Sequence, residues 1–274
     1  MSLIEHLGEL RSRLLKSAIA VIACVALTWT YSDRIYSFLV VPAEAALPQG
    51  THLAYTGIAD PFILYMKVSL MSAAFLASPI LFLQFWLFVS PGLYRKEKRW
   101  VIPFVLAASF FFALGGWFAY RAILPLACEF FIGLGNEAGF QPVITVKELL
   151  SFELQLILGT AVIFEMPILV FFLTRIGILT PAFLWHYFPH AMVLLWFVAA
   201  WVTPPDVFSM VLVGLPMMGL YVLSIGVSWI FQPAKTRARK AAAKPAPADP
   251  KIAPPALEAE GPRGGEGAPP GAGA

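Results

Sequence analysis

The sequence predicts an all-helical integral membrane protein that crosses the bilayer six times. Three observations lead to this fold class: 59% of the 274 residues are hydrophobic, only 13% are charged, and the apolar residues gather in six separate runs. Soluble domains carry about 25% charged residues, so this chain has too few charges to cover a surface that faces water. One helical crossing of the hydrocarbon core takes roughly 20 apolar residues, and the chain is long enough for six crossings with short loops.

The apolar runs define the expected spans, which are residues 14–31, 61–89, 101–126, 149–173, 188–202 and 207–231. The fifth run rises only ~22 Å at 1.5 Å per residue, which is less than the ~30 Å hydrocarbon core. A short span must thin the bilayer or be covered by its neighbours. We therefore expect a thinned or water-filled region near the fifth and sixth spans. Pro216 lies inside the sixth run and is expected to break it.

The N-terminal segment, residues 2–15, is amphipathic. Four leucines recur at helical spacing and form one face: Leu3, Leu7, Leu10 and Leu14. Such a helix is expected to lie on the membrane surface with its leucines toward lipid. Glu9 and Arg13 are four residues apart, so their side chains can pair on this helix.

Basic residues mark alternate boundaries of the expected spans. The boundaries at the N-terminus and after the second, fourth and sixth spans carry Arg11, Arg13, Lys16, Arg95, Lys96, Lys98, Arg99, Arg175, Lys235, Arg237, Arg239, Lys240 and Lys244. The other boundaries carry Arg34, Arg121 and Lys147 beside several acidic residues. Loops rich in Lys and Arg stay on the cytoplasmic side, so both termini are expected in the cytoplasm.

The composition changes at about residue 233. Residues 233–274 are rich in Ala, Pro, Gly and Lys. A segment of this kind cannot bury enough apolar area to offset the entropy lost on ordering. We therefore divide the chain into a transmembrane domain, residues 1–232, and a disordered cytoplasmic tail, residues 233–274.

Glu165 is the least expected residue of the apolar runs because it lies well inside the fourth span. A charged side chain there costs ~3 kcal/mol or more on insertion. Either Glu165 has a functional role, or a protonated carboxyl holds the bundle together through an internal hydrogen bond. Glu153 and Gln155 lie nearer the outer end of the same span, where we expect them to be close to water. Lys67, near the outer end of the second span, is close enough to the membrane surface for its side chain to extend to it.

Glu9 and Glu97 both lie at the expected cytoplasmic surface among basic residues. One interpretation is that they are solvated charges that balance their neighbours. The other is that they form an acidic site for guanidinium groups, which carboxylates bind in a two-pronged fashion.

Signatures of catalysis and of cofactors are weak. Residues 226–229 (GVSW) resemble the serine motif of intramembrane proteases but lack its second glycine, and no histidine lies inside a span to activate Ser228. We expect no enzyme activity, no cofactor, no metal ion and no nucleic-acid partner. A small-solute secondary transporter is the main alternative, but only Glu165 and Pro216 suggest the polar, broken helices of that class.

Four motifs resemble the TatC family, the multispanning receptor subunit of the twin-arginine protein translocase. They are residues 6–14 (HLGELRSRL), 88–99 (FVSPGLYRKEKR), 164–167 (FEMP) and 203–209 (TPPDVFS). Residues 60–62 (DPF) are similar to the start of the second helix in that family. The resemblance covers residues 1 to about 232, with the motifs in the family's order and on the expected sides of the spans.

The resemblance implies a cupped bundle of six helices, with short fifth and sixth helices, in a bacterial inner membrane. It implies that the chain binds the twin-arginine signal peptides of folded cargo at the cytoplasmic face. It also implies single-span partners similar to TatA and TatB, a homo-oligomer within the receptor complex, and transport driven by the proton-motive force.

Site residues follow from the same motifs. Glu9 and Glu97 would contact the arginines of the signal, and Arg11 and Phe88 would shape that site. Glu165 would face a partner helix within the membrane. Pro204, Pro205 and Asp206 would form the outer turn, where the two prolines stop the fifth helix and Asp206 caps the sixth.

Overall fold

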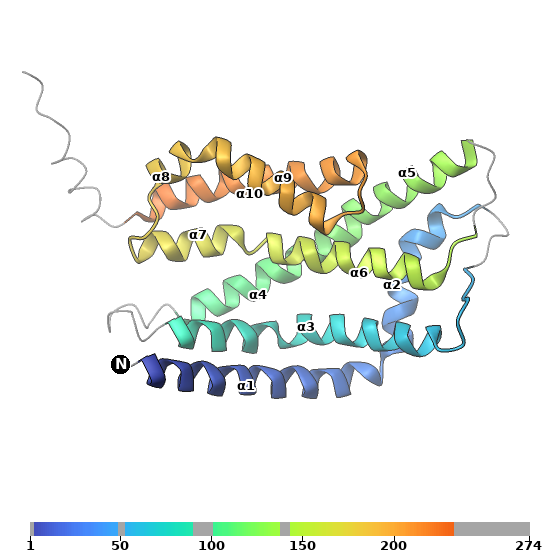
Figure 1. Ribbon diagram of the computed structural model, residues 1–274, viewed down its shortest axis with the longest axis horizontal. Helices are drawn as coiled ribbons and strands as arrows, with labels where there is room; N and C mark the ends of the chain where they lie inside the picture. The colour runs from blue at the N-terminus through green and yellow to red at the C-terminus, as the bar shows by residue number, and fades with distance from the viewer. Residues whose placement is uncertain (1–2, 49–52, 90–100, 138–142, 233–274) are drawn as a thin grey trace, which may run out of the picture. The chain divides into compact units, whose positions relative to one another are not determined.

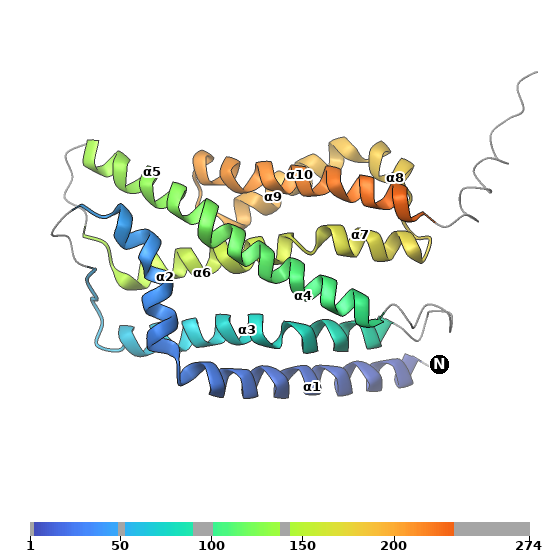
Figure 2. The ribbon, with the colours of Figure 1, turned by 180° about the vertical axis from the view of Figure 1, so that it is seen from behind.

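The computed structural model describes residues 3–48, 53–89, 101–137 and 143–232. In those residues the regular structure is helical, apart from one parallel bridge between Ala54 and Thr145. Figures 1 and 2 show the helices from two sides. In chain order they are α1 (Leu3–Trp29), α2 (Ser32–Ala46), α3 (Asp60–Val89), α4 (Val101–Phe118), the π-helix η3 (Ala119–Ile123), α5 (Leu124–Glu137), α6 (Val146–Ile163), α7 (Met166–Arg175), α8 (Pro181–His186), α9 (Phe188–Val202) and α10 (Val207–Phe231).

The all-helical membrane fold is confirmed. Four stretches of the described chain are long and apolar enough to cross a bilayer: Asp60–Phe88, Val101–Gly135, Val146–Arg175 and Val207–Phe231. α1 and α2 meet that test only as a pair bent by 81°, and α9 is a shorter apolar helix. The second, fifth and sixth expected spans agree with α3, α9 and α10 to within one residue at each end.

The N-terminal helix differs from the expectation. The predicted separate surface helix, residues 2–15, is wrong, because α1 runs without interruption from Leu3 to Trp29 and packs along α3. No proline falls in this stretch to end the helix. The apolar face is nevertheless exposed, since Leu7 and Leu14 have 63% and 67% of their surface accessible.

The sixth helix also differs. The expected break at Pro216 is wrong, because α10 continues through it for 25 residues. At this length the sixth helix is not short, whereas α9 has only 15 residues. Proline is tolerated inside transmembrane helices because neighbouring groups satisfy the freed carbonyl. The continuous helix removes one of the two features that suggested a transporter.

The third run is longer than expected, because its helices extend from Val101 to Glu137 rather than ending at residue 126. The π-helix η3 joins α4 to α5 in its middle. Within η3, the Tyr120 hydroxyl donates to the carbonyl of Phe38 on α2 at 2.7 Å, and the two rings stack. The irregular turn therefore holds α2, a helix that we did not expect between the first two spans.

The fourth run is broken. α6 ends at Ile163 and α7 begins at Met166, with Phe164 and Glu165 in a turn between them. Pro167 in the first turn of α7 explains the break, since proline has no N–H to donate to the carbonyl four residues earlier.

The helix ends gather at two ends of the bundle formed by residues 3–232. Both views show the start of α1 and α4 together with the ends of α3, α7 and α10, which we call the proximal end (Figures 1 and 2). The starts of α3 and α6 lie at the other end, which we call the distal end. Arg13 and Arg175 belong to proximal helix segments, whereas Asp60 and Glu148 belong to distal ones.

Candidate functional site

A polar cluster lies where the first turns of α1 meet the last turns of α3. The Glu9 Oε1 atom accepts a hydrogen bond from Arg13 Nη2 at 3.2 Å, which confirms the expected pairing of these residues. Arg13 Nη1 donates in turn to Gln84 Oε1 on α3 at 3.5 Å. The cluster therefore connects two helices that are far apart in sequence.

Two polar atoms of this cluster lack a hydrogen-bond partner among the described residues. Glu9 Oε2 and Arg13 Nε are buried, and neither has a hydrogen-bond partner among the described residues. Beside them, the rings of His6 and Phe88 stack with their centroids 4.6 Å apart. The arrangement leaves one carboxylate oxygen able to accept a further donor next to an aromatic surface.

Arg11 does not join this cluster. Residues two apart on a helix point about 200° away from each other, so Arg11 lies on another face of α1 than Glu9, and it is exposed. Glu97 lies outside the described residues. The loop that carries it begins after α3 and ends before α4, and both of those helix ends are proximal.

Glu165 occupies the turn between α6 and α7 and is 8% exposed. Its Oε1 atom is buried without a hydrogen-bond partner among the described residues. α4 comes close here because Gly115 faces Ala161 and Phe164 with no room for a Cβ atom. Glu165 thus lies largely buried at a break in a helix, with a small part of its surface exposed.

The turn between α9 and α10 has the predicted capping chemistry. The Thr203 hydroxyl donates to the carbonyl of Ala199 at 2.9 Å, where α9 ends. Asp206 is the N-cap of α10 and accepts from the Ser209 amide at 2.7 Å and from the Ser209 hydroxyl. Pro204 and Pro205 stand between these two groups.

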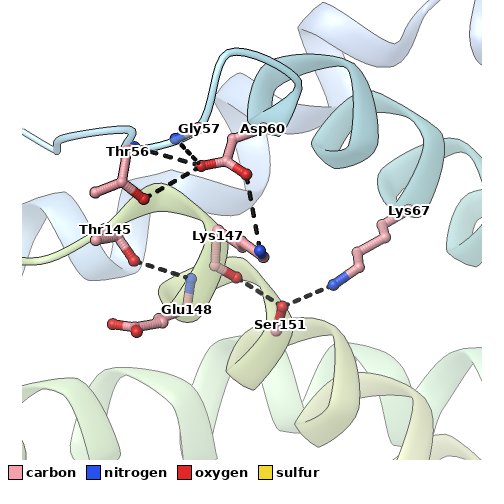
Figure 3. A network of polar contacts seen from close by, with 8 residues as sticks. All are labelled: Thr56, Gly57, Asp60, Lys67, Thr145, Lys147, Glu148 and Ser151. Atoms are coloured by element: carbon pink, nitrogen blue, oxygen red, sulfur yellow. Dashed lines mark hydrogen bonds and ion pairs between the residues drawn. The ribbon is translucent and has the colours of Figure 1, made fainter.

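A second polar network joins the distal loops (Figure 3). One oxygen of Asp60 accepts from the amides of Thr56 and Gly57, at 3.3 and 2.6 Å, and the other lies 3.8 Å from Lys147 Nζ at the start of α6. The Ala54 main chain bonds to the main chain of Ile144 and Val146, at 3.1 and 2.9 Å. These contacts hold the approach to α3 against the approach to α6.

Glu153 is placed differently from the prediction, and Lys67 makes a contact inside the bundle. Lys67 donates to Ser151 on α6 at 2.9 Å instead of extending to the membrane surface. Glu153, expected close to water, has no exposed surface. Glu153 is buried because α6 packs against several elements, which are α3, α4, η3, α9 and the unexpected helix α2. Gln155 is exposed, as expected, and donates to the carbonyl of Trp201 at 3.3 Å.

Comparison with known proteins identifies the family. Residues 5–216 match the family model described as "Sec-independent protein translocase protein (TatC)". This chain belongs to the TatC family. TatC of Desulforapulum autotrophicum is 39% identical over 81% of this chain and 82% of its own length, and TatC of Koribacter versatilis is 37% identical over 88% and 90%.

Solved structures agree with the TatC assignment. A crystal structure of the twin-arginine translocase receptor TatC superposes with a TM-score of 0.74 at 34% identity, over 82% of this chain and 98% of that one. A second crystal structure of that receptor, in DDM, gives a TM-score of 0.75 at 34% identity, over 81% and 99%. The chain is thus a multi-pass membrane protein of a protein-translocase family, and not a member of an enzyme family.

Sequence motifs of this TatC chain locate part of the proximal cluster. In the structure, Glu9 and Phe88 both lie in the polar cluster where α1 meets α3. The cluster also contains His6, Arg13 and Gln84, which were not predicted to belong to a site. Gln84 carried a weak signal, since it is a polar residue within a long apolar run.

Proposed function

We propose that this chain is the receptor subunit of a twin-arginine protein translocase, and that it binds the paired arginines of signal peptides on folded cargo. The observation that carries this proposal is the half-satisfied carboxylate of Glu9 beside the Phe88 ring. A guanidinium group donates through a planar fork that matches a carboxylate. Glu97, in the loop between α3 and α4, supplies the second carboxylate. Arg13, which also donates to Gln84, holds Glu9 in place until the signal arrives.

A crosslinking experiment tests the receptor function. A synthetic signal peptide with a photoreactive group is offered to the chain in inverted membrane vesicles, alongside the same peptide with the arginine pair changed to lysines. The lysine peptide keeps the charge but cannot form the planar fork. We expect the arginine peptide to crosslink and the lysine peptide to crosslink much less. Equal crosslinking of both peptides would contradict the proposal.

Orientation in the membrane is part of the proposal, with both termini in the cytoplasm of a bacterial inner membrane. In a variant lacking Cys24 and Cys128, a cysteine at exposed Ser37 on α2 should react with a membrane-impermeant maleimide added outside intact cells. A cysteine at exposed Ser12 on α1 should react only after the membrane is opened. The reverse pattern would place the proximal end outside and overturn the topology.

The C-terminal segment is proposed to be a separate tail that signal binding does not need. Deleting the residues after Lys240 should leave membrane accumulation and signal-peptide crosslinking unchanged, because the segment carries no apolar face that could pack on the helices. Both quantities are measured on the truncated and full-length chains in parallel. A loss of crosslinking at normal accumulation would show that the tail takes part in recognition.

Assembly is the second part of the proposed function. The chain would dock single-span subunits similar to TatA and TatB, form homo-oligomers within the receptor complex, and use the proton-motive force for transport. Glu165 is the residue that we assign to docking. Polar contacts between membrane helices average ~0.6 kcal/mol and reach ~1.7, which biases the choice of a partner helix without holding a whole bundle together.

Two substitutions of Glu165 distinguish docking from folding. Glu165→Gln keeps the size and the hydrogen-bonding capacity and should retain most export. Glu165→Ala should still accumulate in the membrane, because it removes a group that is costly to insert, but it should lose crosslinking to partner helices. If the alanine variant fails to accumulate, Glu165 has a structural role and the docking assignment is wrong.

A further inference from the structure

Glu153 is the most completely buried carboxyl group of the described chain. It has no exposed surface, and neither of its oxygens has a hydrogen-bond partner among the described residues. An ionised carboxylate in such a place carries a penalty of several kcal/mol. The folded chain therefore accommodates Glu153 in its neutral, protonated form.

The surroundings of Glu153 offer hydroxyl and thiol groups rather than a cation. The side chains on which its charge would act are Tyr36 on α2, Tyr120 in η3 and Cys128 on α5. The Tyr120 hydroxyl already donates its proton to the carbonyl of Phe38. The thiol of Cys128 is free and buried.

The basic groups of the helices around α6 are occupied elsewhere or turned outward. Lys67 on α3 donates to Ser151, and Lys147 faces Asp60. Arg34, Arg121 and His190 are exposed. α5 and the helices that pack against α6 carry further titratable groups. These are carboxyls, tyrosine hydroxyls and one thiol: Asp33, Tyr36, Glu44, Asp60, Tyr65, Tyr120, Cys128, Glu129 and Glu137.

α2 is one of the helices that pack against α6, together with α3, α4, η3 and α9. Its residues Leu39, Val40 and Ala43 are buried in the same hydrophobic cluster as Leu150 and Leu154 of α6. Figure 2 shows α2 lying at the distal end beside the starts of α3 and α6. Moving α2 away would uncover part of α6 on this side.

Tyr36 connects Glu153 with a cavity at the distal end. The cavity measures about 370 Å³ and is lined by Tyr36, Glu44, Asp60 and Tyr65 among others. Tyr36 therefore belongs to the wall of the cavity, and a charge on Glu153 would act on its hydroxyl.

We propose that Glu153 is a proton-binding site in the distal half of the bundle, reached from the cavity past Tyr36, and that loss of its proton releases α2 from α6. The carboxyl O–H bond breaks, the proton passes to a water molecule of the cavity as hydronium, and a carboxylate remains. That carboxylate requires hydration, which the packed α2 prevents. Docking of α2 and proton binding at Glu153 are thus linked, and each stabilises the other.

Hydrogen exchange of the full-length chain in lipid nanodiscs measures the linkage. Protection of the α2 amides, corrected for the intrinsic effect of pH on exchange, should fall by up to about tenfold per pH unit in the range where release of α2 also releases the one proton of Glu153. Protection of α10 should stay level. In Glu153→Gln and Glu153→Leu, which have no proton to lose, α2 protection should not depend on pH. Glu148→Gln, a change of an exposed glutamate on the same helix, should behave as the parent does.

Either of two hydrogen-exchange results would overturn the proposal. One is an α2 protection in the parent chain that does not change with pH, a result that requires no variant to fold. The other is a Gln or Leu variant whose α2 protection falls as in the parent. Infrared spectra supply a direct check, because the carbonyl band of protonated carboxyls should lose one component in Glu153→Gln. An unchanged band would show that Glu153 carries no proton. Signal-peptide crosslinking does not enter these measurements, so their failure leaves the receptor function standing.

Discussion

Replacing Gly115 with alanine is expected to destabilise the protein by ~1–3 kcal/mol, the usual cost of an extra methyl group in a packed interior. A Cβ atom at this position would lie 2.7 Å from the Cβ of Phe164 and 2.8 Å from the Cα of Ala161. The second contact is with the α6 main chain, which cannot rotate away. The measurement is the midpoint of thermal unfolding in detergent, and Gly115→Leu should prevent accumulation altogether.

Gly133 on α5 provides the matched control. A Cβ atom there meets nothing within 4 Å, and alanine is the better helix former by up to ~1 kcal/mol. Gly133→Ala should therefore leave the midpoint unchanged or raise it. Equal losses in both variants would show that α4 and α6 do not cross as closely as the structure has them.

Signal binding should weaken about tenfold or more when either Glu9 or Glu97 becomes alanine. A hydrogen bond to a charged group contributes ~1.5–3 kcal/mol, and 1.4 kcal/mol corresponds to about a tenfold change in affinity. Glu9→Ala also leaves Arg13 without its partner beside the incoming arginines, which adds repulsion. Affinity is measured by titrating a fluorescent signal peptide onto the purified chain.

The control for these two variants is Glu148→Ala, which removes the same charge from an exposed distal position. It should bind the signal peptide as the parent does. If both proximal variants also bind as the parent does, the proposed arginine site is wrong, and the resemblance of residues 6–14 and 88–99 to the family does not extend to their roles.

The boundaries of a helix were predicted correctly from the sequence where the helix ends at the end of an apolar run. α3, α9 and α10 are of this kind, since charges or prolines flank them. The prediction failed where one helix crosses a change of composition. α1 passes from an amphipathic segment into an apolar one, and periodicity alone placed a boundary where the backbone has no reason to stop.

The buried carboxyls show the other limit of prediction. Glu165 was recognised because an apolar run surrounds it, which is local information. Glu153 was expected near water because its depth was judged from its own span alone. Its burial comes from packing between α6 and helices far away in sequence, among them α2, which begins more than a hundred residues earlier in the chain. His6 and Gln84 were missed in the proximal cluster for a similar reason, since contact between α1 and α3 is what gives them a role.

The short helix α9 determines how deep the turn after it lies. Val202, the last residue of α9, packs against Gly159, which is 13 residues into α6 and therefore ~20 Å from its start at 1.5 Å per residue. Asp206 follows four residues later, so this polar cap also lies at that depth. A bilayer that adapts to α9 is ~22 Å thick instead of ~30 Å. The same transmembrane voltage then falls over a shorter distance, so the electric field beside α9 is about 1.4 times that in the surrounding membrane.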